Sequence, residues 1–181
     1  MRKQLRPFYS PEELARVYDH VYDHTRWGDH IERVRKTTEI LDWFALERGA
    51  TSVADLSCGD GAIVLNSRHE WDAVTLGDYV TTGPIEAALV HLPHVDMFVL
   101  SETLEHVEDP DNLLAAIRVV ADNLVLTTPY GEVSDENPEH YWGWDDEGVR
   151  EIAENAGWRV HSFQLFTPTI DYYTFQMWTF K

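Results

Sequence analysis

The amino-acid sequence predicts an α/β protein with a doubly wound, mostly parallel sheet and one antiparallel strand near the C-terminus. From residue 52 onward, β-type runs alternate with helical patterns, which is typical of parallel strands covered by helices. The run Val95–Leu100 is almost continuously apolar, as in a strand that is buried on both faces. The short glycine loop Ser57–Gly61 follows a β-type run and precedes an apolar run, as at the first turn of nucleotide-binding sheets.

Residues 1–48 are expected to form an N-terminal helical cap within a single domain that spans residues 1–181. Ser10-Pro11-Glu12-Glu13 has the pattern of a helix start with a capping box. That helix would place five apolar or aromatic side chains on one face: Leu14, Val17, Tyr18, Val21 and Tyr22. A second helix is expected from Asp29 to about Arg48, where Gly49 would end it.

The rest of the chain, residues 49–181, is expected to form the sheet and its covering helices. Strands are predicted at 52–56, 72–77, 95–100 and 123–127, and helices at 62–67, 84–92, 109–121 and 145–156. A final pair of strands at 158–166 and 172–180 is expected to form a hairpin that supplies the antiparallel strand. Asp96 follows Asp78 by only 18 positions, so a third strand in this interval is predicted to be missing or short.

Charge and composition exclude several classes of partner. The formal net charge is −18, and it falls on residues 49–181, which carry five basic and 23 acidic side chains. Such a surface repels phosphate backbones and argues against a long nucleic acid as partner. The sequence has no apolar run of the about 18 residues that a membrane span needs. Cys58 is the single cysteine, which excludes an internal disulfide and makes a cytoplasmic location the expectation.

The glycine loop lacks the patterns of two common nucleotide sites. A dinucleotide loop aligned on Gly59 and Gly61 would need a glycine at position 64, which is Val64. A P-loop would need Gly-Lys-Ser or Gly-Lys-Thr, which the sequence does not contain. The segment Asp55-Leu56-Ser57-Cys58-Gly59-Asp60-Gly61 instead resembles the first motif of class I S-adenosylmethionine (SAM) dependent methyltransferases.

Four later segments resemble further motifs of that family in the same order, and together they cover roughly residues 50–165. They are Asp78, Val99–Val107 with Asp109-Pro110, Leu126–Pro129, and Asn155–Trp158. The resemblance implies a Rossmann-like fold, SAM as cofactor, and six cofactor-binding residues: Asp55, Ser57, Gly59, Gly61, Asp78 and Ser101. Asp78 would accept hydrogen bonds from the ribose hydroxyls. Ser57 stands where the family usually has glycine.

A Glu-x-x-Glu-His segment follows the predicted strand 95–100. Glu102, Glu105 and His106 are spaced so that one turn of chain points them to the same side, where doubly wound sheets bind their ligands. Two converging carboxylates repel each other, and a divalent cation removes that repulsion. The segment is similar to those of metal-dependent small-RNA 3′-terminal 2′-O-methyltransferases and of the O-methyltransferases of ubiquinone biosynthesis.

That similarity implies Glu102, Glu105, His106 and His140 as ligands of a divalent metal. Mixed carboxylate and imidazole ligands suit Mn²⁺, Co²⁺ or Fe²⁺ better than Mg²⁺. The alternative without a metal makes His106 the general base and leaves the acids to stabilise a helix start. In both cases, His106 and Glu105 are the candidate catalytic residues.

The sequence therefore predicts a SAM-dependent methyltransferase that acts on a hydroxyl of a small-molecule acceptor. Two alternatives stay open: a SAM-binding partner module without catalysis, and a methyltransferase that modifies a nucleotide or nucleic acid. Among the aromatic residues, Tyr18 and Tyr22 are interpreted as core, and Tyr141, Trp142 and Trp144 either line an acceptor pocket or cover the sheet. His30 and Arg33 are candidates to meet a substrate.

Overall fold

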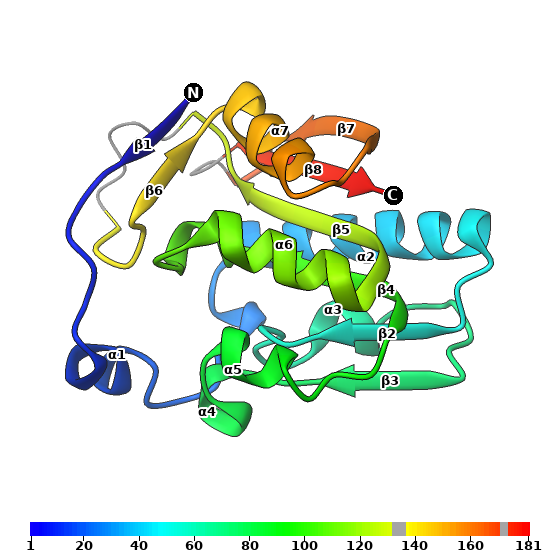
Figure 1. Ribbon diagram of the computed structural model, residues 1–181, viewed down its shortest axis with the longest axis horizontal. Coiled ribbons are helices and arrows are strands. Elements are labelled where there is room, and N and C mark those ends of the chain that lie inside the picture. Colours follow the sequence, from blue (N-terminus) through cyan, green and yellow to red (C-terminus); the bar gives the residue numbers. More distant parts are fainter. Residues whose placement is uncertain (132–136, 171–173) are drawn as a thin grey trace.

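The computed structural model describes residues 1–131, 137–170 and 174–181, and its centre is a six-stranded sheet (Figure 1). In spatial order, the strands are β3 (Ala73–Leu76), β2 (Ser52–Asp55), β4 (Val95–Ser101), β5 (Ala121–Pro129), β8 (Phe175–Phe180) and β7 (Val160–Phe166). The first four are parallel, and β8 runs antiparallel to both β5 and β7. The predicted Rossmann-like sheet with one antiparallel strand is confirmed.

Helices cover both faces of this sheet (Figure 1). They are α1 (Pro11–Val17), the 3₁₀ helix η1 (His24–Arg26), α2 (Gly28–Arg48), α3 (Ala62–Leu65), α4 (Tyr79–Thr82), α5 (Ile85–Leu89), the 3₁₀ helix η2 (Leu104–His106), α6 (Pro110–Val120) and α7 (Asp146–Asn155). Successive β4 residues alternate between the faces, so Phe98 packs with α5, α6 and α7 and Met97 packs with α2 and α3. This explains why β4 is apolar along nearly its whole length.

The interval between β3 and β4 agrees with the expectation of a missing third strand. Residues 77–94 are all described, and they form α4 and α5 without any strand. The helix predicted at 84–92 is shorter than expected, and α4 was not predicted. Gly83, with φ of 78°, separates the two short helices. Strand β3 is therefore one of the two edge strands of the sheet and pairs only with β2.

The first helix is shorter than the pattern predicted. It ends at Val17, and Tyr18 already has non-helical dihedral angles of −102° and 54°. Tyr18 turns toward His106, and its hydroxyl lies 3.2 Å from His106 Nδ1. Val21 and Tyr22 lie beyond the helix and are exposed. A contact with a distant residue therefore overrides the local helical pattern.

A second, two-stranded sheet pairs β1 (Arg2–Gln4) with β6 (Trp142–Trp144), and neither strand was predicted. Each is three residues long, and their register joins Arg2 to Trp144. Such short strands carry no periodic signal of their own. The other predicted elements differ from those observed by a few residues at their ends. Residues 172 and 173 of the last predicted strand lie outside the described residues.

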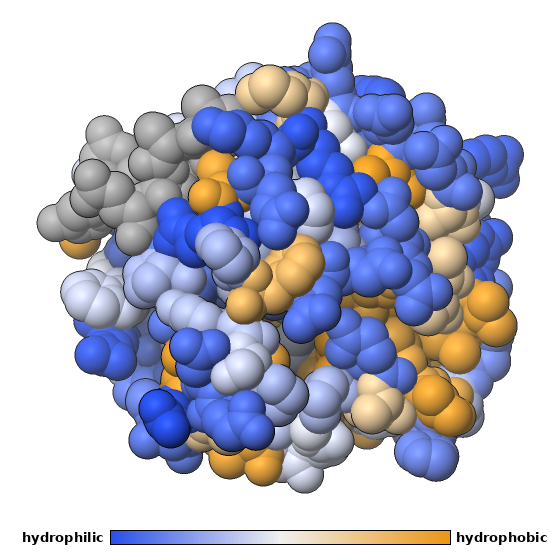
Figure 2. Space-filling model, turned by 60° about the vertical axis from the view of Figure 1, so that its left-hand side comes forward, coloured by the Kyte–Doolittle hydropathy of each residue, from blue (hydrophilic) through white to orange (hydrophobic). Residues whose placement is uncertain are grey.

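Hydrophilic side chains dominate the face shown in Figure 2, where hydrophobic residues form only small, separate patches. Within the residues that the structure describes, no helix combines the length and apolar character of a membrane span.

Candidate active site

A cavity of about 880 Å³ lies at the carboxyl ends of β2, β3 and β4. Its floor includes the glycine loop after β2, Asp78 after β3, and the residues from Ser101 to Thr103 after β4. The N-terminal segment closes another side through residues of α1, η1 and the start of α2. Doubly wound sheets bind ligands at this edge, and the volume falls within the range of cofactor pockets.

The glycine loop takes a conformation that favours glycine at two positions. Gly59 has φ of 54° and Gly61 has φ of 78°, both in the left-handed region. A side chain at Gly59 would also come within 3.0 Å of the backbone oxygen of Tyr22. The Asp60 Oδ2 accepts hydrogen bonds from the His24 backbone N at 3.1 Å and from His24 Nδ1 at 2.5 Å. The N-terminal segment therefore lies directly on the loop.

Asp78 lies beside this loop, as the resemblance implied. Its Oδ2 accepts a hydrogen bond of 3.1 Å from the Gly59 backbone N, and its Oδ1 accepts one of 3.2 Å from Val80 N. A carboxylate offers about four acceptor positions. Asp78 therefore keeps capacity for two hydroxyl donors while it holds the loop and caps α4.

Asp55 and Ser57 form the base of the loop. Asp55 is buried, and its Oδ1 accepts a hydrogen bond of 3.1 Å from Ser57 N. Burial raises the pKa of Asp55 to about 7, although the hydrogen bonds from Ser57 oppose this shift. The Ser57 hydroxyl accepts a hydrogen bond of 2.8 Å from Thr103 Oγ1. Serine in place of the usual glycine thus ties the loop to the chain that follows β4.

Ser101 contacts an arginine that comes from α2. Arg33 Nη1 donates a hydrogen bond of 2.8 Å to Ser101 Oγ, and Ser101 and Thr127 share a hydroxyl contact of 2.7 Å. Arg33 is only 4% exposed, and its Nε has no hydrogen-bond partner among the described residues. Arg33 also lines the cavity. An unpaired guanidinium N–H in this position suits a carboxylate or another anionic ligand group.

Glu102 is held in an unusual backbone conformation. Its φ of 51° is the only positive value at a non-glycine residue in the described part of the chain, and such strain often marks functional positions. Its Oε1 accepts a hydrogen bond of 2.9 Å from Thr127 Oγ1. Burial raises the pKa of Glu102, while the nearby Arg33 opposes that shift. The Glu102 carboxylate therefore accepts a hydrogen bond from Thr127 and interacts with the charge of Arg33.

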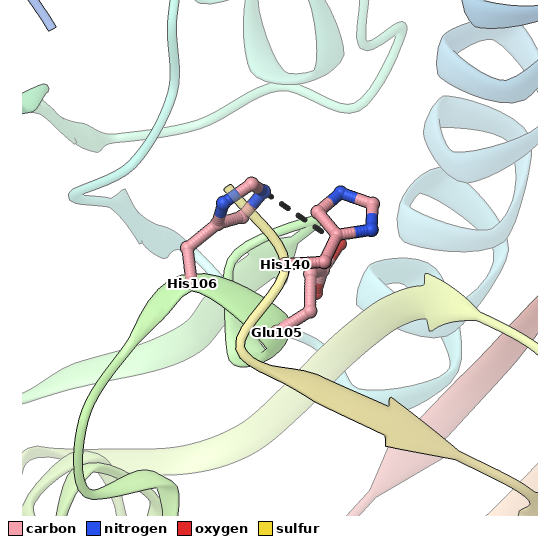
Figure 3. A group of neighbouring side chains, drawn as sticks. All are labelled: Glu105, His106 and His140. Atoms are coloured by element: carbon pink, nitrogen blue, oxygen red, sulfur yellow. Dashed lines mark ion pairs between the residues drawn. The ribbon is translucent and has the colours of Figure 1, made fainter. Parts of the chain in front are cut away.

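Three of the four predicted metal ligands come together (Figure 3). Ligand atoms of Glu105, His106 and His140 all lie within 4.8 Å of one another, and Glu102 is not part of this group. Glu105 is 1% exposed, and its Oε2 accepts a hydrogen bond of 2.9 Å from Thr128 Oγ1. Its Oε1 has no hydrogen-bond partner among the described residues and lies 3.9 Å from His106 Nε2. Burial, and next the Glu102 charge, raise the pKa of Glu105 to about 8.

The contacts of His106 determine which ring nitrogen carries its proton. Nδ1 lies 3.0 Å from the backbone oxygen of Glu139, which can only accept a hydrogen bond. Nδ1 is therefore the nitrogen that carries a proton in this contact, and Nε2 is the ring nitrogen that faces Glu105. The ring of His140 stands almost perpendicular to that of His106, at 82° and 4.8 Å between centroids. This arrangement presents a basic nitrogen next to a buried carboxyl.

The structure corrects the interpretation of several aromatic residues. Tyr18 and Tyr22 were interpreted as core, but both line the cavity. Tyr141 also lines it, whereas Trp144 is packed in the core beneath the sheet's helices. His30 lines the cavity too, and burial lowers its pKa to about 4.

Sequence reasoning did not single out Thr103 or Glu139 as residues of the site. Thr103 follows the carboxyl end of β4, and this position in the sequence could have identified it as a residue of the site. The backbone oxygen of Glu139 had no sequence signal, because it acts through the main chain.

Comparison with known proteins identifies the fold. No protein-family model and no curated protein sequence matches this chain. Among solved structures, a 1,6-didemethyltoxoflavin-N1-methyltransferase of Burkholderia thailandensis matches with a TM-score of 0.65 and 19% identity, over 97% of this chain and 91% of that one. The magnesium protoporphyrin IX methyltransferase of Synechocystis PCC 6803 with bound SAM matches with a TM-score of 0.64 and 14% identity, over 94% and 90%. The cyclase SpnF matches with a TM-score of 0.70 and 12% identity, over 98% of both chains.

These likenesses show that the chain has the fold of SAM-dependent methyltransferases. At identities of 12% to 19% they show the fold alone. SpnF is a cyclase, so the same fold also serves another reaction, and the chemistry of this chain has to be argued from its own residues.

Proposed function

We propose that this chain is a SAM-dependent methyltransferase that transfers a methyl group to a hydroxyl of a small-molecule acceptor. The observation that carries the proposal is the hydrogen bond from Gly59 N to Asp78 Oδ2, which joins the glycine loop to the acid after the next strand on the floor of the cavity. Two of the proteins that share the fold were solved with SAM or S-adenosylhomocysteine bound.

The residues of the cavity fit the parts of SAM. The remaining acceptor capacity of Asp78 suits the two ribose hydroxyls. The unpaired Nε of Arg33 suits the carboxylate of the methionyl group. Asp55, Ser57, Gly59, Gly61 and Ser101 shape the floor between these two ends. We assign them to cofactor binding on this basis.

SAM supplies an electrophilic methyl group on a sulfonium. The chain must then align the acceptor oxygen in line with that methyl group and remove its proton. Without a metal, His106 Nε2 is the proposed general base, because Nδ1 donates its proton to the Glu139 carbonyl. The neighbouring Glu105 would stabilise the protonated imidazole once the proton has moved.

Glu105, His106 and His140 also fit a divalent cation. A buried carboxylate with one unpaired oxygen needs either a proton or a cation. Ring nitrogens of His106 and His140 lie within 4.8 Å of the Glu105 carboxylate, close enough for one ion to contact all three side chains. Mn²⁺, Co²⁺ and Fe²⁺ suit this donor set better than Mg²⁺. Such an ion lowers the pKa of a bound hydroxyl and can hold two neighbouring oxygens. Glu102 would join as a fourth ligand by giving up its hydrogen bond to Thr127.

The charges around the cavity favour a small acceptor that is uncharged or cationic. Besides the residues already assigned, five carboxylates line it: Asp60, Glu86, Glu108, Asp109 and Glu139. Arg26 and Arg33 are the arginines on the lining. This balance disfavours a polyanionic acceptor, so modification of a nucleic acid is the weaker alternative.

The cofactor assignment is tested by calorimetric titration of SAM into the wild-type chain and into Asp78→Ala. We expect about ten-fold weaker binding or more in the variant, since it loses hydrogen bonds to a charged acceptor. Asp122→Asn, which removes an exposed acid 60% accessible and outside the cavity, should leave the affinity unchanged. Equal affinities for wild type and Asp78→Ala would refute the ribose role.

The catalytic assignment is tested by transfer of a labelled methyl group from SAM to a panel of catechols and vicinal diols. We expect that a chelator and Glu105→Gln each reduce the rate by at least about ten-fold, because the chelator removes the cation that would lower the pKa of the hydroxyl and the substitution removes one of its anionic ligands. If neither treatment reduces transfer, the metal model is wrong. If SAM binds tightly and no acceptor is methylated, the alternative of a SAM-binding module without catalysis gains support.

A further inference from the structure

Strand β7 forms one edge of the main sheet, and its outer side has no partner strand. Among residues 1–131, 137–170 and 174–181, no backbone hydrogen bond joins β7 to any strand except β8. In an antiparallel pair, alternate residues direct their N–H and C=O groups away from the partner. The outer side of β7 therefore presents a row of backbone donors and acceptors that can bind a further strand.

The side chains of β7 do not protect this edge from pairing. Natural edge strands are usually short or carry charged residues or proline. Residues 160–166 include no acid, lysine, arginine or proline, although 25% of the whole chain is charged. Strand β3, at the other edge, has both kinds of protection, because it is only four residues long and lies between Asp72 and Asp78. This difference between the two edges favours pairing at β7.

A second copy of β7 would fit this edge without charge repulsion. The bulge at the start of β7 leaves residues 162–166 in regular register with β8. Antiparallel pairing about a two-fold axis at Gln164 would bring Phe163 of each copy opposite Leu165 of the other. Leu165 is 47% exposed in the single chain, so this pairing would cover it with an aromatic ring. Cross-strand pairs of this kind stabilise antiparallel sheets.

A groove of about 320 Å³ lies beside this edge and offers room for side chains of an added strand. It is formed by residues 162–164 and by one side of α2, which contributes Lys36, Glu39, Ile40 and Trp43. Trp43 is 46% exposed, and tryptophan is among the side chains that contribute most to protein interfaces. Lys36 Nζ lies 3.5 Å from Glu39 Oε2, so opposite charges balance on this wall. The groove is therefore neutral in a chain of net charge −18.

We propose that two copies of this chain associate through β7, so that their main sheets join across a two-fold axis into one sheet. Such an interface uses the same patch of both copies, and a neutral edge with a self-complementary register meets that requirement. The cavity at the carboxyl ends of β2, β3 and β4 stays open in this dimer, because no residue of β7 lines it. This inference does not depend on the proposed function.

Sedimentation velocity of the full chain between about 1 µM and about 100 µM tests the proposal by mass action, at about 0.15 M salt to screen the net charge. We expect the wild type to reach the mass of two chains at the upper concentration. Gln164→Lys would place two like charges at the two-fold axis and should weaken association by at least about ten-fold. Val119→Lys is the matched control, because it makes the same change in net charge at a position on α6 that is 77% exposed. It should leave association unchanged.

Circular dichroism establishes that both variants are folded, and a second measurement needs no variant. Deuterium uptake at residues 160–166 of the wild type should be slower at about 100 µM than at about 1 µM, because the second copy would cover this edge. The proposal is overturned if the wild type is a monomer at the upper concentration, if Gln164→Lys and Val119→Lys affect association equally, or if uptake at 160–166 does not depend on concentration.

Discussion

Asp55 lies at the base of the glycine loop, and its burial makes ionisation of its carboxyl group unfavourable. It is 2% exposed, and it accepts a hydrogen bond from Ser57 N that shapes the loop. Burial raises its pKa to about 7, well above the ordinary value of about 4. The folded chain therefore binds a proton that the unfolded chain has already lost between these two values.

This difference predicts a pH dependence of stability. As the pH rises from about 4 to about 7, the Asp55 contribution to stability falls, and above about 7 the loss stays constant. Each unit of pKa shift corresponds to about 1.4 kcal/mol. Asp55→Asn cannot ionise but keeps an acceptor for Ser57, so its melting temperature should fall less than that of the wild type between about pH 5 and about pH 8.

Differential scanning calorimetry of both chains over that pH range measures the effect. Asp72→Asn, at an exposed acid outside the cavity, serves as the control and should follow the wild-type curve. Parallel curves for wild type and Asp55→Asn would show that Asp55 ionises with an ordinary pKa.

At the residue scale, sequence reasoning succeeds where topology places the side chain. Asp55 ends β2, and Asp78 and Glu105 follow β3 and β4, the parallel neighbours of β2, so the order of the sheet brings all three to one edge. The contact of Arg33 with Ser101 and that of Tyr18 with His106 span 68 and 88 positions. No local sequence pattern specifies such pairs, because they depend on how the N-terminal segment packs against the sheet.

At the element scale, the end of α2 depends on a single glycine. Gly49 has φ of 63°, and its backbone N–H bonds the carbonyls of Ala45 and Leu46. A side chain there would meet no atom within 4 Å. Any cost of a substitution is therefore conformational rather than steric.

We expect Gly49→Ala to lower the free energy of unfolding by about 1 kcal/mol, because alanine is strained in the left-handed conformation. Urea denaturation measures this change. Arg35→Ala, on an exposed position within the same helix, should change the stability by less than about 0.5 kcal/mol. SAM affinity should be the same in both variants. If Gly49→Ala leaves the free energy of unfolding unchanged, the end of α2 can unwind locally without destabilising the chain.

The longest helix and strand β4 were among the elements that the sequence predicted well. Helix α2 has 21 residues and β4 has seven, so their patterns repeat often enough to be recognised. The three-residue strands β1 and β6 form because they pair with each other, although they are far apart in the sequence. Helix α4 has four residues and begins at Tyr79, directly after Asp78, whose side chain caps it. Short elements of this kind are consequences of the fold and cannot be inferred before it.

At the scale of the whole molecule, the net charge of −18 is expected to lower the stability of the folded chain. Folding brings the charged side chains closer together than they are in the unfolded chain, and Figure 2 shows that hydrophilic side chains prevail on the face that it displays. Their mutual repulsion opposes the compact state. Salt weakens this repulsion, since the screening length falls from about 30 Å at 0.01 M to about 3 Å at 1 M.

The melting temperature should therefore rise when sodium chloride is increased from about 0.01 M to about 1 M. Thermal unfolding followed by circular dichroism at several salt concentrations measures the change. The same series in potassium chloride controls for effects of a particular cation. A melting temperature that falls or stays constant would show that attractive pairs outweigh the net repulsion.

Strand β3 has a neighbour on one side only, and Asp78 lies two residues after its end. Amide protons on an uncovered edge exchange with solvent through small local openings, whereas those of β4 and β5 exchange through larger ones. Deuterium uptake should therefore be fastest along β3 and slowest in the middle of the sheet. A cofactor held by Asp78 would slow uptake at 73–82 more than at β4. Protection that appears uniformly across the sheet would mean that this edge opens only with the whole molecule.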